Sequence, residues 1–306
     1  MRGITFHVSL FTRIESPVMS HHKMRPETER YLTLVHQGRN QWWRYVLGAL
    51  VILFFWLVLG FLPYIWLNGG GSPDPLLDYI AVNFSIVMML GGLFLTVRVI
   101  HRRPLLSLLS AERALDWKRI SQSAAAWSVI GLVFAVIEHL LYPDRYYLSF
   151  NTERFFVFAL MALVLTPIQT TTEELVFRGY VMQGLGLVIR RPAMIAVLSG
   201  VIFTVPHLLN PEVQQHGVVL MAASYFAIGL LLAAVTLRDG RLELAIGVHA
   251  ANNLLLVLVA NYEGSVLKTD SIFTARGLDP LYTLITLTAG ALVFYWWIFR
   301  RAAENP

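Results

Sequence analysis

Eight apolar stretches divide most of this chain, and they constrain its fold more than any other feature. They cover residues 45–67, 78–99, 121–141, 154–171, 193–209, 217–237, 242–260 and 280–299. Each is close to the roughly 20 residues that an α-helix needs to cross a bilayer. Continuous apolar runs favour helices over alternating strands, and lipid admits only helices and closed barrels. We therefore predict an all-α, polytopic membrane bundle of about eight transmembrane helices.

The composition agrees with this prediction and removes several classes of function. The chain is 56% hydrophobic and only 14% charged, whereas about a quarter of a soluble domain is charged. The net charge of +5 does not indicate nucleic acid, because the basic residues lie between the apolar stretches. The absence of cysteine excludes disulfides, thiolate nucleophiles and cysteine-ligated metals.

Lys and Arg are distributed unevenly between alternate loops. Cytoplasmic loops of membrane proteins carry an excess of these residues. With the N-terminus in the cytoplasm, four of the 24 fall on the far side: Arg145, Arg154, Lys268 and Arg276. We therefore predict a multi-pass protein of a bacterial cytoplasmic membrane, surrounded by lipid, with both termini in the cytoplasm.

The polar N-terminal region, residues 1–43, is expected to be a cytoplasmic tail, followed by a single membrane domain at 44–301. Between the second and third stretches, residues 102–119 mix leucines with charged residues, which predicts a helix in the cytoplasmic interface. Polar groups that do not belong in lipid gather between about residues 120 and 260. We expect the catalytic core there.

Two adjacent acids and an arginine form the first polar cluster. Charged groups at membrane depth are costly and usually functional. On a helix, Glu174 and Arg178 are i,i+4 neighbours and can pair, whereas Glu173 is turned by about 100° from Glu174. Glu173 would keep a free carboxylate, and a buried, unpaired carboxylate can act as a general base. An ion pair at a helix end explains Glu174 and Arg178 but leaves Glu173 unexplained.

The second cluster lies late in the fifth stretch, where Phe203 is followed four residues later by His207. A lone histidine in a span is often a packing group. However, Glu173 is 19 residues before Pro192 and His207 is 15 residues after it, so a helical hairpin brings them to similar depths. The expected cavity opens toward the cytoplasmic side, because Arg178 and residues 190–191 lie there.

The third cluster is His249 with Asn253, which share one helix face, while Asn252 faces elsewhere. An imidazole and a carboxamide on one face can donate hydrogen bonds to an oxyanion. By themselves, they are better explained as an interhelical hydrogen-bonding pair that stabilises the bundle.

Together these residues resemble the CAAX protease and bacteriocin-processing family, also called the Abi family. That family includes the type II CAAX prenyl endopeptidases. Its signature consists of Glu-Glu-x-x-x-Arg, Phe-x-x-x-His and His-x-x-x-Asn, and the three motifs begin here at Glu173, Phe203 and His249. The resemblance covers about residues 120–260.

The resemblance implies an intramembrane endopeptidase of the glutamate type, which acts on membrane-anchored or lipidated proteins or peptides, including prenylated CAAX-type substrates. Glu173 would activate water together with His207, and His249 and Asn253 would stabilise the tetrahedral oxyanion. The residues that would support the site are Glu174, Arg178 and Phe203.

Other mechanisms and functions are weighed against this one. There is no His-Glu-x-x-His zinc motif and no serine elbow. We expect no cofactor, although Glu173, His207 and His249 could supply three ligands for zinc. A non-catalytic scaffold or bacteriocin-immunity protein would use the same fold to hold a partner. A proton-coupled transporter is weakened by the lack of a visible inverted repeat.

Overall fold

The computed structural model describes residues 24–68, 74–112 and 114–304. Within them the chain is mostly helical, and two shorter apolar helices, Pro192–His207 and Glu243–Val259, accompany six longer ones. The six are long and apolar enough to cross a membrane: Trp42–Trp66, Pro75–Ile100, Trp117–Leu141, Thr152–Leu185, Val218–Asp239 and Pro280–Arg300. These helices indicate an integral, multi-pass membrane protein. All eight predicted stretches are helical, although two are shorter than the span predicted for them.

The α-helices in chain order are α1 (Pro26–Thr33), α2 (Trp42–Leu53), α3 (Phe61–Asn68), α4 (Pro75–Leu95), α5 (Trp117–Leu141), α6 (Thr152–Glu174), α7 (Met182–Leu185), α8 (Pro192–His207), α9 (Pro211–His216), α10 (Val218–Asp239), α11 (Glu243–Leu254) and α12 (Pro280–Glu304). Four π-helical segments continue them: η2 (Phe54–Leu59), η3 (Thr96–Ile100), η6 (Leu175–Val181) and η7 (Leu255–Val259). Three short 3₁₀ turns are η1 (Leu34–Gln37), η4 (Leu105–Leu108) and η5 (Pro143–Arg145).

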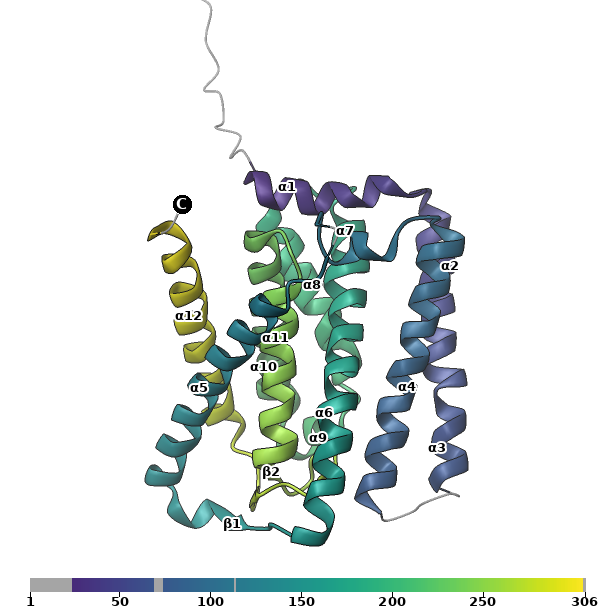
Figure 1. Cartoon of the computed structure of the whole chain (residues 1–306). Helices are drawn as coiled ribbons and strands as arrows, with labels where there is room; N and C mark the ends of the chain where they lie inside the picture. Colours follow the sequence, from purple (N-terminus) through teal and green to yellow (C-terminus); the bar gives the residue numbers. More distant parts are fainter. Residues whose placement is uncertain (1–23, 69–73, 113, 305–306) are drawn as a thin grey trace, which may run out of the picture.

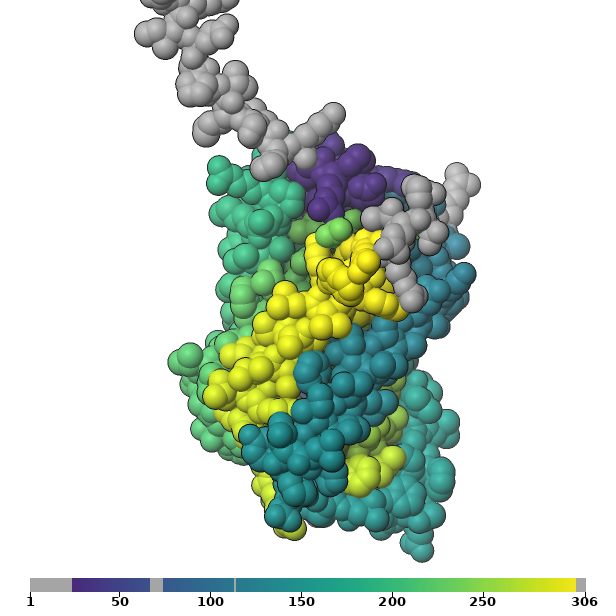
Figure 2. Space-filling view, turned by 90° about the vertical axis from the view of Figure 1, so that its left-hand side faces the viewer, coloured from purple at the N-terminus to yellow at the C-terminus, as the bar shows by residue number. Residues whose placement is uncertain are grey.

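The helices stand side by side with both ends of the described chain at the same end of the bundle (Figure 1). Helix α1 crosses that end, and the C-terminal end of α12 lies there too. Helix α12 runs alongside α5 (Figure 2), and the Tyr282 hydroxyl donates to the carbonyl of Phe134 between them.

A small sheet at the opposite end departs from the predicted all-α fold. Its three strands are β1 (Tyr146–Leu148), β2 (Ala260–Tyr262) and β3 (Phe273–Ala275). The central β3 pairs antiparallel with β1 and parallel with β2. Loop backbone outside the helices needs hydrogen-bond partners, and these strands supply them for the loops that follow α5 and η7.

Glycines let the helices around the polar residues approach closely. A Cβ at Gly229 of α10 would lie 3.2 Å from the Cα of Gly200 of α8. A Cβ at Gly247 of α11 would lie 2.1 Å from the Ser123 Oγ and 2.2 Å from the Ile120 carbonyl oxygen of α5. Small residues at interfaces are the usual way for helices to pack in membranes.

The predicted interfacial helix at residues 102–119 is wrong. Among the described residues between η3 and α5, only η4 is helical, and Arg103 turns inward from the preceding loop. Its guanidinium donates to the Ser107 hydroxyl and to Gln183. Pro104 disfavours helical geometry at the residue before it, so the helix cannot begin earlier. Leu108, which would have faced lipid, is fully buried instead.

Part of the polar N-terminal region packs against the bundle. In α1, Tyr31 is fully buried, and its hydroxyl can donate to the carbonyl of Leu108 or of Arg178. The Thr28 hydroxyl donates to the carbonyl of Leu237 in α10. Helix α1 therefore covers the end of the bundle where the termini lie. The division into a tail at 1–43 and a domain at 44–301 stays a prediction.

Candidate active site

Two acids and an arginine lie where an α-helix becomes a π-helix. Glu173 and Glu174 end α6, and Arg178 lies in η6, which continues the same long helix. Such π-helical turns are frequent at functional sites. Glu174 and Arg178 are fully buried and Glu173 is nearly so. Buried charges of this kind require partners, which the surrounding helices supply.

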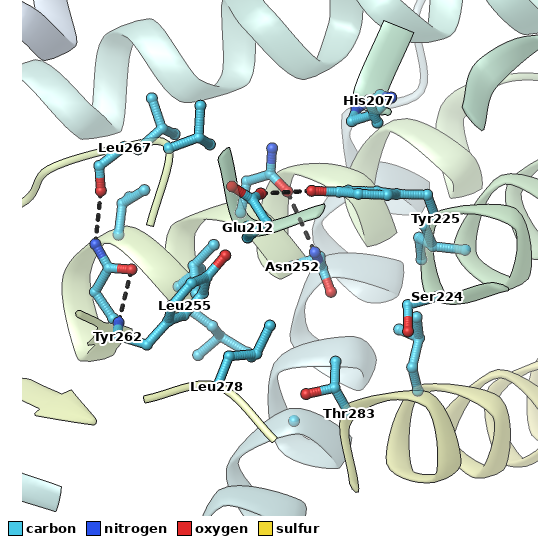
Figure 3. A pocket seen from close by; sticks show the side chains of 18 of the residues that line it. His207, Glu212, Ser224, Tyr225, Asn252, Leu255, Tyr262, Leu267, Leu278 and Thr283 are labelled. Carbon is cyan, nitrogen blue, oxygen red and sulfur yellow. Dashed lines mark hydrogen bonds between the residues drawn. The ribbon is translucent and has the colours of Figure 1, made fainter. Parts of the chain in front are cut away.

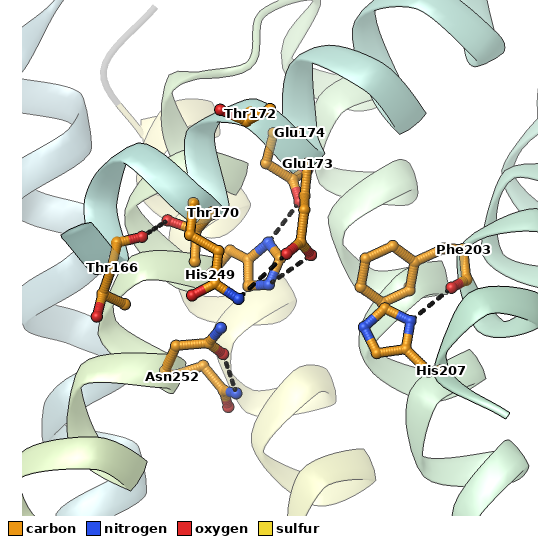
Figure 4. A network of polar contacts seen from close by, with 12 residues as sticks. Thr166, Thr170, Thr172, Glu173, Glu174, Phe203, His207, His249 and Asn252 are labelled. Atoms are coloured by element: carbon orange, nitrogen blue, oxygen red, sulfur yellow. Dashed lines mark hydrogen bonds and ion pairs between the residues drawn. The ribbon is translucent and has the colours of Figure 1, made fainter. Parts of the chain in front are cut away.

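One oxygen of Glu174 holds two cationic or polar groups. Its Oε1 accepts a hydrogen bond from Arg178 Nη1 at 2.8 Å and lies 2.7 Å from His249 Nδ1. Because a carboxylate only accepts, Nδ1 carries the hydrogen and donates it. The second guanidinium nitrogen of Arg178 donates to the Gly229 carbonyl at 3.0 Å, and its Cζ lies 4.4 Å over the Phe203 ring. Glu174 therefore orients both Arg178 and His249, and Figure 4 shows its contact with His249.

Glu173 has weaker contacts and faces the other nitrogen of the same imidazole. Its Oε2 lies 3.7 Å from His249 Nε2, beyond hydrogen-bond length. Its Oε1 accepts from Gln169 Nε2 at 3.3 Å, one turn earlier on α6. The Glu173 carboxylate thus accepts one long hydrogen bond, where the sequence predicted a free carboxylate, while Glu174 is paired with Arg178.

His207 lies at the end of α8 between two aromatic rings. Its Nδ1 is 2.8 Å from the Phe203 carbonyl oxygen, so this nitrogen donates and Nε2 stays available. The Phe203 and Tyr225 ring centroids are 4.5 Å and 4.6 Å from that of the imidazole. The Tyr225 hydroxyl in turn donates to the buried carboxylate of Glu212 (Figure 3).

A cavity of about 540 Å³ joins these groups. Glu173, His207, His249 and Asn253 all line it. From this level its lining continues past Glu138, Tyr146, Tyr262 and Asp279 at the end of the bundle that holds the strands. Pockets that bury small ligands have volumes of roughly 300–1,000 Å³.

The direction of the cavity differs from the one predicted. Its lining reaches the strand end, whereas the expectation placed its mouth at the end that holds the termini. Arg178 indicated that expectation, but helix packing buries it away from either surface. If the termini lie in the cytoplasm, the cavity extends toward the opposite side of the membrane.

The four predicted catalytic residues therefore all line this cavity, as does the supporting residue Phe203, whereas Glu174 and Arg178 are fully buried and do not line it. Within the described part of the chain, no hydrogen bond joins His207 to Glu173. Sequence reasoning missed several polar neighbours: Gln169, one turn before Glu173 on the same helix, Asn252, on a face that was set aside, and three residues from distant segments, Trp127, Glu212 and Tyr225. The Glu174–His249 hydrogen bond was also missed, because only the fold brings α6 and α11 together.

The three residues considered as zinc ligands are not grouped as such. Across the described ranges, no three His, Cys, Asp or Glu side chains form a set that could hold a metal ion. The His249 nitrogens face the two glutamates, with Nδ1 already bonded to Glu174.

Comparisons with known proteins agree with the motifs. Residues 152–255 match the model of the Rce1-like type II CAAX prenyl endopeptidases. The uncharacterized protein YyaK of Bacillus subtilis (strain 168) is 30% identical over 275 residues, which span 84% of this chain and 91% of YyaK. No solved structure matches the chain. The matched range lies inside the predicted core and contains all three motifs.

Proposed function

Because this chain belongs to the Rce1-like family of type II CAAX prenyl endopeptidases, we propose that it is an intramembrane endopeptidase. It hydrolyses peptide bonds of membrane-anchored or lipidated proteins or peptides, with prenylated CAAX-type chains as one candidate class. The observation that carries the proposal is the buried His249, held by Glu174 and facing Glu173 across a cavity that His207 and Asn253 also line.

The reaction begins with a water molecule in this cavity. Glu173, whose carboxylate has no tight partner, accepts a proton from the water as the oxygen attacks the scissile carbonyl carbon. The carbon becomes tetrahedral and its oxygen becomes negative. The C–N bond then breaks, and the proton is returned to the leaving amine. His207 Nε2 has no hydrogen-bond partner among the described residues and is suited to share in this proton transfer.

His249 and Asn253 are the proposed donors to the oxyanion. Since Nδ1 of His249 is bonded to Glu174, only Nε2 faces the cavity. A protonated imidazole between two carboxylates can donate at both nitrogens. Removing one donor of an oxyanion hole typically lowers kcat by about 10²–10³-fold.

The test is cleavage of membrane-presented peptides, CAAX-terminated and not, by the purified full chain in lipid. We compare wild type, Glu173→Gln and Glu153→Gln. Glu153 lies on the same helix but is exposed and does not line the cavity, so it is a matched control. We expect Glu173→Gln to lose cleavage and Glu153→Gln to keep it. Full activity in Glu173→Gln would overturn the mechanism.

A strong chelator separates the glutamate mechanism from the zinc alternative. We expect cleavage by wild type to continue in its presence. Loss of cleavage that added zinc restores would instead make Glu173, His207 and His249 metal ligands.

A further inference from the structure

A chain of side-chain hydrogen bonds runs from α5 to Asn253. The indole Nε1 of Trp127 donates to the Oδ1 of Asn252 at 3.2 Å. The Nδ2 of Asn252 donates to the Oδ1 of Asn253 at 3.2 Å. Trp127 is buried, whereas Asn252 and Asn253 are half-buried and, like the indole, line the cavity. Asn252 is labelled in Figure 4, with the second of these bonds drawn as a dashed line.

The indole determines the direction of every bond in this chain. A carboxamide has a donor end and an acceptor end of nearly the same shape, so its orientation follows from its partners. An indole N–H can only donate, and Asn252 must therefore present its oxygen to Trp127. Its NH₂ group then faces Asn253, which must present its own oxygen. Only the NH₂ group of Asn253 is left for the cavity.

We infer that Trp127 and Asn252 are positioning residues that hold the Asn253 NH₂ group toward the substrate's carbonyl oxygen. The inference rests on the proposed function, in which Asn253 donates to the oxyanion. A reversed Asn253 would present an oxygen to a developing negative charge and would oppose the reaction. Pre-organised donors are effective because they need no reorientation as the charge develops.

The packing of the helices fixes the position of the Trp127 indole, from which the chain of hydrogen bonds begins. The absent side chain of Gly247, two residues before His249 and five before Asn252, lets α5 approach α11 closely. On its other side the Trp127 ring meets Phe294 of α12 edge to face, with centroids 5.9 Å apart. Trp127 is thus fixed by two helices, and its N–H reaches Asn252 without leaving the core.

Three substitutions separate this role from ordinary packing. Trp127→Phe removes the N–H and keeps most of the ring. Asn252→Asp still accepts from Trp127 but cannot donate, so the Asn253 NH₂ group turns toward it. Asn253→Ala removes the donor. We expect kcat to fall about 10-fold in Trp127→Phe and about 10²-fold in Asn252→Asp and Asn253→Ala, with KM little changed.

The decisive comparison is between single variants and double variants that also contain Asn253→Ala. In the Asn253→Ala background, Trp127→Phe and Asn252→Asp should cost nothing further, because both act through Asn253. The control is Trp117→Phe, because Trp117 is an exposed tryptophan at the start of α5. This variant should leave kcat unchanged. Additive losses, or a rise in KM with kcat retained, would overturn the inference.

The indole N–H signal in nuclear magnetic resonance tests the hydrogen bonds without any cleavage. The Trp127 signal is the one that Trp127→Phe removes from the uniformly labelled protein. We expect Asn252→Ala to shift it upfield as its acceptor is lost, and an unmoved signal would refute the chain of bonds. If the signal shifts while wild type cleaves no peptide, the bonds are upheld and the proposed function fails.

Discussion

At the scale of single residues, the two adjacent glutamates differ in what their charge does. Glu174 compensates the fully buried Arg178, whereas Glu173 has no tight partner. Removing one member of a buried ion pair typically costs about 3–5 kcal/mol. Glu174→Gln should therefore lower the melting temperature of the detergent-solubilised protein sharply, while Glu173→Gln leaves it nearly unchanged. Equal melting temperatures would show that the Arg178 charge is compensated elsewhere.

His101, outside the membrane-spanning helices, makes stability depend on pH. Its Nδ1 donates to the Arg39 carbonyl and its Nε2 accepts from Tyr180, so the neutral ring is fully bonded. Burial lowers the pKa of His101, against the effect of the Arg39 hydrogen bond. As pH falls below the unfolded pKa of about 6.5, the unfolded chain takes up a proton that the folded chain does not. Stability is therefore lost toward acid.

The measurement is the melting temperature between about pH 7.5 and 5.5, the range in which histidine titrates. Wild type should lose more of its melting temperature toward acid than His101→Gln, since glutamine does not titrate. Identical slopes would mean that His101 contributes nothing to the pH dependence.

Sequence spacing was sufficient for contacts within a helix and insufficient across helices. The i,i+4 spacing of Glu174 and Arg178 correctly predicted their pair. The same spacing led us to set Asn252 aside, because it is turned from Asn253 on the helix. Its contacts depend on Trp127, 125 positions earlier, and on the approach of α5. No local pattern records which helices become neighbours.

At the scale of elements, the contact between α5 and α11 depends on one position without a side chain. Gly247→Ala would place a Cβ far inside contact distance of the Ile120 carbonyl oxygen. Overpacking a core typically costs about 1–3 kcal/mol. We expect a lower melting temperature and, because Trp127 moves away from Asn252, reduced cleavage.

Gly91→Ala is the matched control for this substitution. Gly91 is also within a helix, α4, but a Cβ there would lie 3.6 Å from the nearest atom of Phe55, an ordinary contact. The melting temperature of the Gly91→Ala variant should therefore equal that of wild type. If Gly247→Ala were equally stable and active, the two helices would not need their close approach.

Element boundaries were predictable where apolar runs were long and failed where tertiary contacts decided. The stretch predicted at 154–171 is helical, and the helix continues through Glu173 to Leu185. The three-residue strands are too short to show any alternation, and they exist because loops from both sides of the core meet. Residues 102–119 looked amphipathic, yet buried Arg103 and its partners draw that segment inward as a loop.

At the scale of the whole molecule, the basic loop residues and the cavity lie toward opposite ends of the bundle. Basic residues concentrate in the loops at the end where the termini lie, and the cavity extends to the strand end. If the positive-inside rule sets the orientation, the cavity faces away from the cytoplasm. We propose this orientation, with both termini in the cytoplasm. Water and substrate would then reach Glu173 from the outer side.

The orientation can be measured directly because the chain contains no cysteine, so one introduced thiol is the sole target. Glu29→Cys lies on α1 at the terminal end and Glu153→Cys at the start of α6 at the strand end, and both positions are exposed. In intact bacterial cells with the outer membrane removed, a membrane-impermeant thiol reagent should label Glu153→Cys. The reagent should label Glu29→Cys only after the cells are lysed. The reverse pattern would place the cavity on the cytoplasmic side, where the loop charges would no longer follow the positive-inside rule.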